Sequence, residues 1–163
     1  MGKARLLAST FALAIVLALG VSMSASAHTG AGITKHEAAV TLKNLKANGW
    51  VWLDKDRNFH RITRLSAAYW GVSYAWMHNC AHSEGLQGHT ILWADNYAGA
   101  GGPFQYLDGT FSGFSRHAWA AMKARGLRVP VVYRSKGSLV GQALTTGWAF
   151  RNGLSFHWYG TGC

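Results

Sequence analysis

The sequence predicts a mainly helical α+β domain with one small β-hairpin. Two observations indicate this fold class. Apolar residues recur at three- and four-residue spacing in several segments that carry helix start and stop residues. A Gly-rich stretch at residues 85–109 holds only short apolar runs. The length of 163 residues fits one domain, and 49% hydrophobic with 13% charged residues excludes a disordered chain.

Residues 1–27 are predicted to be a secretory signal peptide. Lys3 and Arg5 precede an apolar stretch at residues 6–19, and Ala25-Ser26-Ala27 matches the A-x-A cleavage pattern. The apolar stretch is too short for a transmembrane helix, so a retained signal anchor is the weaker alternative. We therefore expect a secreted or cell-wall-associated protein. Loss of Lys3 and Arg5 lowers its formal net charge by two, from +10 to +8.

Export decides how the charge and the cysteines are interpreted. A basic exported protein meets anionic surfaces such as lipid headgroups or a phosphate-bearing cell wall, and we expect no nucleic-acid partner. Cys80 and Cys163 are an even pair in an oxidising compartment, which predicts a disulfide between them. Two free thiols are the alternative.

An N-terminal helical segment with a connector is expected at residues 28–60. Thr34 and Glu37 match a capping box at a helix start, and Gly49 is expected to end that helix. Residues 50–60 are predicted to be a polar connector with a turn at residues 54–58. A small metal-binding loop there lacks oxygen ligands in the right order.

An apolar stripe follows and leads to Glu84. Its members, which recur every three or four residues, are Ile62, Leu65, Tyr69, Val72, Trp76 and Cys80. Gly71 leaves two shorter helices as the alternative to one. Continuing the stripe places Glu84 on the core-facing side of a helix end, just before Gly85. Burial and the negative end of the helix dipole are expected to raise the pKa of its carboxyl there.

Beyond Glu84, short strands and then two helices are expected. The strands are residues 91–93 and 104–107, arranged around a Gly-rich turn. The helices are residues 110–125 and 138–152, stopped by Gly126 and Gly153. The small hairpin is therefore placed directly after the Glu84 helix.

Glu84 has the properties of a catalytic acid. Cleavage of a glycosidic bond requires an acid that is still protonated near neutral pH, which a partly buried Glu provides. Only six acidic residues are present, so few carboxylates compete for such a role. The alternative is a solvated side chain at a helix end.

The order of these motifs resembles a known group of enzymes. Ser83-Glu84-Gly85, followed by Ala98-Gly99-Ala100-Gly101-Gly102-Pro103-Phe104-Gln105, resembles the signature of lysozyme-like soluble lytic transglycosylases, although Pro103 replaces their usual Leu or Met. Trp93-Ala94-Asp95, with Asp108 after the Gly-rich segment, resembles the hairpin of goose-type lysozymes. A Cys four residues before the Glu, with a partner near the C-terminus, is similar to resuscitation-promoting factors of actinobacteria. The resemblance covers residues 70–163.

The resemblance implies a lysozyme-like catalytic domain at residues 61–163. Glu84 would act as general acid and then base on the β-1,4 bond between N-acetylmuramic acid and N-acetylglucosamine in peptidoglycan glycan strands. Gln105 would line the cleft. Asp95 takes the place of the carboxylate that positions water in goose-type lysozymes, whereas lytic transglycosylases need no second carboxylate. No cofactor or metal is implied, and we expect a monomer for which anionic wall polymers are further candidate partners.

Aromatic residues near the hairpin or the C-terminal tail are candidate sugar-binding walls. They are Trp93, Tyr97, Tyr106, Trp158 and Tyr159. Sugar rings present flat C–H faces that stack on aromatic rings, but aromatic residues also dominate protein cores. Core packing is therefore the alternative role for each of them.

Two other functions compete with glycan cleavage. His78 and His82 lie four residues apart, and with Cys80, Glu84 and His89 they could bind zinc in a hydrolase. A disulfide at Cys80 would remove one of these ligands. The second competitor is a non-catalytic cell-wall-binding or antimicrobial protein on a lysozyme-like scaffold, which the charge and aromatic content fit equally well.

Overall fold

A computed structural model describes residues 32–163, apart from residues 89, 94–98 and 162. The predicted leader at residues 1–27 and the candidates Asp95, Tyr97 and His89 lie outside the described residues. The described part is mainly helical, as predicted. Its α-helices are α1 (Lys35–Lys43), α2 (Ala47–Leu53), α3 (Phe59–Trp70), α4 (Tyr74–Glu84), α5 (Asp108–Ala124) and α6 (Leu139–Arg151). The shorter elements are the 3-10 helices η1 (Asp56–Asn58), η2 (Val131–Tyr133) and η3 (Ser155–Thr161) and the strands β1 (Leu86–Gln87) and β2 (Thr90–Ile91).

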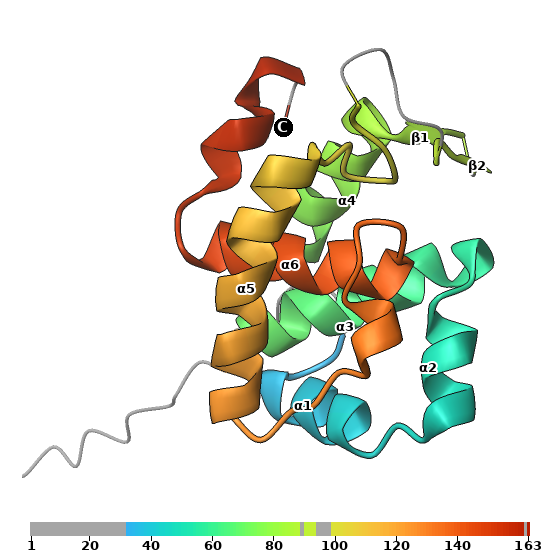
Figure 1. Cartoon of the computed structure of the whole chain (residues 1–163), viewed down its shortest axis with the longest axis vertical. Helices are drawn as coiled ribbons and strands as arrows, with labels where there is room; N and C mark the ends of the chain where they lie inside the picture. Colours follow the sequence, from blue (N-terminus) through green and yellow to red (C-terminus); the bar gives the residue numbers. More distant parts are fainter. Residues whose placement is uncertain (1–31, 89, 94–98, 162) are drawn as a thin grey trace, which may run out of the picture.

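Helix α6 forms the centre of the fold. It runs between α3 and α5 (Figure 1), and most of its residues are buried. On the α3 side, the Ser66 hydroxyl donates to the Ala143 carbonyl at 2.7 Å, and the Trp70 indole donates to the Leu144 carbonyl at 2.9 Å. Gly147 permits this close approach, because a Cβ there would collide with the Ser66 hydroxyl and the Trp70 ring. Small residues and side-chain hydrogen bonds thus join the two helices.

The apolar stripe from Ile62 onward forms two helices, which confirms the alternative with two helices. Gly71 ends α3 in the left-handed conformation, with φ of 72°, which glycine adopts without steric cost. Ser73 begins α4, because its hydroxyl accepts the Trp76 N–H at 3.2 Å. Helix α4 then ends at Glu84, as predicted.

The N-terminal helical segment is only partly as predicted. The capping box of Thr34 and Glu37 is present, but the expected stop at Gly49 is wrong, because Gly49 lies inside α2. Helix α2 also occupies the start of the expected polar connector. Trp50 and Leu53 are 3% and 1% exposed, and burial of two large side chains outweighs the low helix propensity of glycine.

The β-hairpin lies directly after Glu84, as predicted, but its strand pairing differs. β1 pairs with β2 in antiparallel register, with Leu86 opposite Ile91. The expected strand at residues 104–107 is wrong, since its residues contribute only an isolated bridge between Gly101 and Tyr106. Gln105 explains the difference, because its φ of 43° interrupts the extended conformation.

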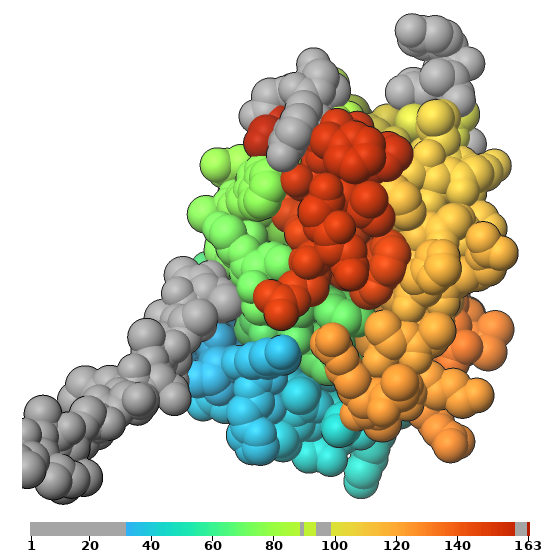
Figure 2. Space-filling view, turned by 90° about the vertical axis from the view of Figure 1, so that its left-hand side faces the viewer, coloured from blue at the N-terminus to red at the C-terminus, as the bar shows by residue number. Residues whose placement is uncertain are grey.

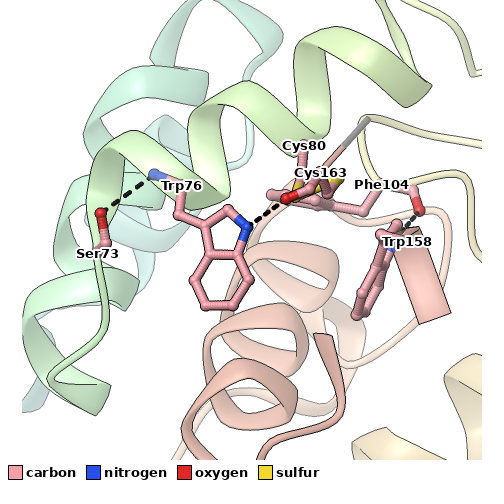
Figure 3. Close-up of a disulfide and its surroundings, with 6 residues drawn as sticks. All are labelled: Ser73, Trp76, Cys80, Phe104, Trp158 and Cys163. Carbon is pink, nitrogen blue, oxygen red and sulfur yellow. Dashed lines mark hydrogen bonds between the residues drawn. A yellow bond between two sulfur atoms is a disulfide. The ribbon is translucent and has the colours of Figure 1, made fainter. Parts of the chain in front are cut away.

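The later helices and the disulfide agree with the sequence. Gly126 and Gly153 follow α5 and α6 with φ of 74° each. The predicted disulfide between Cys80 and Cys163 is present and links the segment after α6 to α4 (Figure 3). Figure 2 shows this C-terminal segment packed between α4 and α5. None of the helices in the described part of the chain has the length and apolar character needed to cross a bilayer.

Candidate active site

Glu84 lines a hollow of about 250 Å³ in which three segments of the chain meet. The segments are the end of α4, the loop leading into α5, and η3. The residues that line the hollow are Glu84, Phe104, Gln105, Tyr106, Leu107, Thr110, His157 and Trp158. The structure therefore brings together four of the predicted site residues, namely Glu84, Gln105, Tyr106 and Trp158.

The end of α4 positions Glu84. Met77, Cys80 and Ala81 are buried one and two turns earlier, and Glu84 follows on that side of the helix as a half-buried residue. The next residue, Gly85, contacts the loop at residues 99–105, called the Gly-rich loop below. The contact is so close that a Cβ at Gly85 would collide with the backbone of Gly102. Glycine at this position lets the loop pass against the helix end that carries the carboxyl group.

Hydrogen bonds from the side chain of Gln142 fix the Gly-rich loop. This buried side chain of α6 donates to the carbonyl oxygens of Gly101 at 2.9 Å and Lys136 at 2.7 Å, and it accepts the Phe104 N–H at 3.2 Å. A Cβ at Gly102 would collide with the Gln142 amide. Gln142 was not among the site residues predicted from the sequence. The available signal was a lone amide within an otherwise apolar and small-residue helix.

Gln105 adopts a strained backbone conformation at the mouth of the hollow. Its φ of 43° lies in the left-handed region, which costs a residue other than glycine about 1 to 3 kcal/mol. Its side-chain amide donates to the carbonyl oxygens of Gly102 at 2.9 Å and Leu92 at 3.2 Å. Such strain clusters at functional sites, and here it fixes the position of a polar side chain beside Glu84.

Replacing Gln142 with Met is expected to lower the free energy of unfolding by about 2 to 4 kcal/mol, because three backbone groups, two of them in buried hydrogen bonds, lose their partner. Urea unfolding measures the change. The matched control is Gln87→Met on the exposed face of the hairpin, which is expected to change stability by no more than about 0.5 kcal/mol. Equal stability of Gln142→Met and wild type would show that the loop does not depend on this side chain.

Tyr106 and Trp158 form the floor of the hollow. They are 2% and 4% exposed, and their rings pack edge to face with centroids 5.4 Å apart. The Tyr106 hydroxyl and the Thr146 hydroxyl share a hydrogen bond of 3.0 Å, and burial raises the pKa of Tyr106. The Trp158 indole donates to the Phe104 carbonyl at 3.0 Å (Figure 3). Neither ring offers an open face, so both support the hollow from within the core.

Trp93 is not among the residues that line the hollow. Its indole N–H contacts both carboxylate oxygens of Asp56, at 2.9 and 3.0 Å. Asp56 belongs to η1, where only a solvated turn was expected, and no local pattern could join residues so far apart in sequence. Two other aromatic candidates cannot be placed, because Tyr97 and the side chain of Tyr159 lie outside the described part.

Two histidines of the rival metal site, His78 and His82, form a row of rings with His60, which was not part of that prediction. On α4, the ring centroids of His78 and His82 are 4.4 Å apart, and His60 of α3 lies 5.0 Å from His78. Burial, and then the charges of His82 and His60, lower the pKa of His78. Cys80 is bonded to Cys163 and cannot serve as a thiolate ligand. Among the described residues, which exclude His89, no three His, Cys, Asp or Glu side chains are grouped to hold a metal ion.

Comparisons of the chain with protein-family models, curated proteins and solved structures found no match. The candidate site is therefore defined by its own residues and contacts.

Proposed function

We propose that the protein is a secreted, lysozyme-like enzyme that cleaves peptidoglycan at the β-1,4 bond between N-acetylmuramic acid and N-acetylglucosamine. The observation that carries this proposal is the placement of Glu84. Its half-buried side chain closes α4 and lines a hollow together with Gln105. The helix, acid, hairpin and Gly-rich loop follow one another in the order of the soluble lytic transglycosylases.

The proposed chemistry uses Glu84 twice. The Glu84 carboxyl donates its proton to the glycosidic oxygen, and the bond to the anomeric carbon breaks. The resulting carboxylate then accepts a proton from the group that attacks the anomeric carbon. In a lytic transglycosylase this group is the 6-hydroxyl of the same N-acetylmuramic acid. In an inverting muramidase Glu84 acts only as the acid, and a second carboxylate accepts the proton of the attacking water. Gln105, fixed by its two hydrogen bonds, would orient the glycan strand.

The second carboxylate decides between these two products. An inverting hydrolase would need one about 6.5 to 9.5 Å from Glu84, and Asp95 is our candidate, although it lies outside the described residues. Among the described carboxylates, Asp56 is bound by the Trp93 indole and Asp108 pairs with Lys136 at 2.7 Å. The transglycosylase route needs Glu84 alone.

Mass spectrometry of purified peptidoglycan incubated with the protein tests the proposal. Soluble muropeptides ending in anhydro-muramic acid, one water lighter than hydrolysed ends, would identify a lytic transglycosylase. Reducing ends would identify a muramidase and assign Asp95 a catalytic role. Absence of soluble fragments would contradict cleavage altogether.

Charge supports a second candidate function, a non-catalytic wall-binding or antimicrobial protein. The formal net charge is +10, and three arginines line one groove of the surface. This alternative predicts that Glu84→Gln binds walls and kills cells as the wild type does, with no glycan fragments from either protein.

A further inference from the structure

A strongly basic groove lies between α1 and α3, away from the hollow of Glu84. It encloses about 580 Å³, and Arg57, Arg61 and Arg64 line it together with His60. These residues follow one another along η1 and α3 at three- and four-residue spacing, so they share one side of the helix. A row of guanidinium groups beside a groove is the arrangement that binds repeated anions.

Aromatic rings hold two of these arginines in place. The Arg61 guanidinium lies 5.0 Å from the Trp52 ring centroid, and the Arg64 guanidinium lies 5.0 Å from that of Tyr74. The Tyr74 hydroxyl is in turn 3.0 Å from Nδ1 of His60. A guanidinium stacked on a ring keeps its N–H donors at its edge, where they can bind a phosphate in bidentate fashion.

The charges around the groove are poorly balanced. Helix α3 contains no acidic residue, so none of its arginines has an acidic partner within the helix. Glu37 also lines the groove, and its carboxylate accepts the backbone N–H and the hydroxyl of Thr34, each at 2.8 Å. One carboxylate therefore faces three arginines, and an anionic ligand would relieve their repulsion.

We infer that this groove binds a linear polymer that carries phosphodiester groups, such as an anionic polymer of the cell wall. The Arg61 guanidinium lies against Trp52 of α2, and the Arg64 guanidinium lies against Tyr74 of α4. Because different elements hold the two charges, they suit successive anions of one chain better than a single phosphate. Ile33, which is only partly buried, adds apolar surface for the carbon units between phosphates. This inference goes beyond the proposed function and does not depend on catalysis by Glu84.

Binding to immobilised poly(glycerol phosphate) tests the inference. The Arg61→Gln/Arg64→Gln double variant is expected to bind at least about tenfold more weakly than wild type, because it loses two charge-assisted contacts. The matched control is Arg116→Gln/Arg151→Gln, which removes the same charge from exposed positions on α5 and α6. It is expected to weaken binding less than about threefold, by the loss of long-range attraction alone. Thermal unfolding of each variant verifies that it is folded.

Further arms of the experiment separate the possible sources of phosphate. Inorganic pyrophosphate is expected to compete with the polymer for the wild type, and phosphatidylglycerol vesicles are expected to bind less tightly than the polymer. Equal losses in both double variants would overturn the inference in favour of general charge attraction. Tight binding to vesicles or to DNA, with none to the polymer, would also overturn it. Measuring Glu84→Gln in parallel keeps the two proposals distinguishable, because that variant should bind the polymer as wild type does.

Discussion

Glu84→Gln is expected to slow the release of soluble muropeptides by about 10²- to 10⁴-fold, the contribution typical of a general acid–base residue. Glutamine has nearly the same shape as glutamate but cannot supply the acidic proton. The half-buried position at the end of α4 accommodates the amide without new bulk. The expected result is therefore an inactive protein with an unchanged fold, measured as the rate of fragment release alongside the far-ultraviolet circular dichroism spectrum.

Glu37→Gln is the matched control for this prediction. It makes the same chemical change in the capping box of α1, where the Glu37 carboxylate contacts Thr34. Loss of the carboxylate there is expected to cost about 1 kcal/mol of stability or less. The rate should stay unchanged on peptidoglycan stripped of anionic polymers, because the groove that Glu37 lines then has no ligand. If Glu84→Gln retained a substantial share of the wild-type rate, Glu84 could not be the acid. If both variants lost activity together, the loss would reflect stability.

Local chemistry made much of the helical framework predictable. The Thr34 capping box, the Gly71 break and the Gly153 stop all depend on residues within one or two turns of the chain. Gly49 shows where this reasoning ends, because α2 forms around it through the distant contact of Trp50 with Tyr133, whose rings lie 6.3 Å apart. Tertiary burial there overrides the local preference.

The same difference between local and long-range interactions decides which residues of the candidate site could be predicted. Glu84 could be placed from helical periodicity, and Gln105 only from the resemblance of the Gly-rich segment to that of lytic transglycosylases. The role of Gln142 could not be predicted, because it arises only when α6 packs against the loop at residues 101–104. The contact of Trp93 with Asp56 likewise joins two segments that have no shared pattern. The position of a residue that is fixed by long-range packing cannot be predicted from its neighbours in the sequence.

Removal of the disulfide is expected to lower the free energy of unfolding by about 4 kcal/mol. Cys80 and Cys163 are separated by 83 residues, and a cross-link across such a long loop restricts the unfolded chain strongly. Guanidinium unfolding of the Cys80→Ala/Cys163→Ala variant measures the difference. Reduction of the wild type with dithiothreitol should give a similar loss, and the same treatment of the variant should give none. An unfolding midpoint that stays the same after reduction would contradict the prediction.

The disulfide should also matter to the hollow. It holds the segment that contributes His157 and Trp158 to the lining, with further support from the Trp76 indole, which donates to the Cys163 carbonyl at 2.8 Å (Figure 3). We expect the reduced protein to lose glycan cleavage at denaturant concentrations where it is still mostly folded, because local opening of a terminal segment costs less than global unfolding. Tryptophan fluorescence should change together with that loss, and because the chain has eight tryptophans, the part of the change missing in Trp158→Phe reports on this segment. Parallel loss of activity and of the whole fold would instead show that the bond acts on global stability alone.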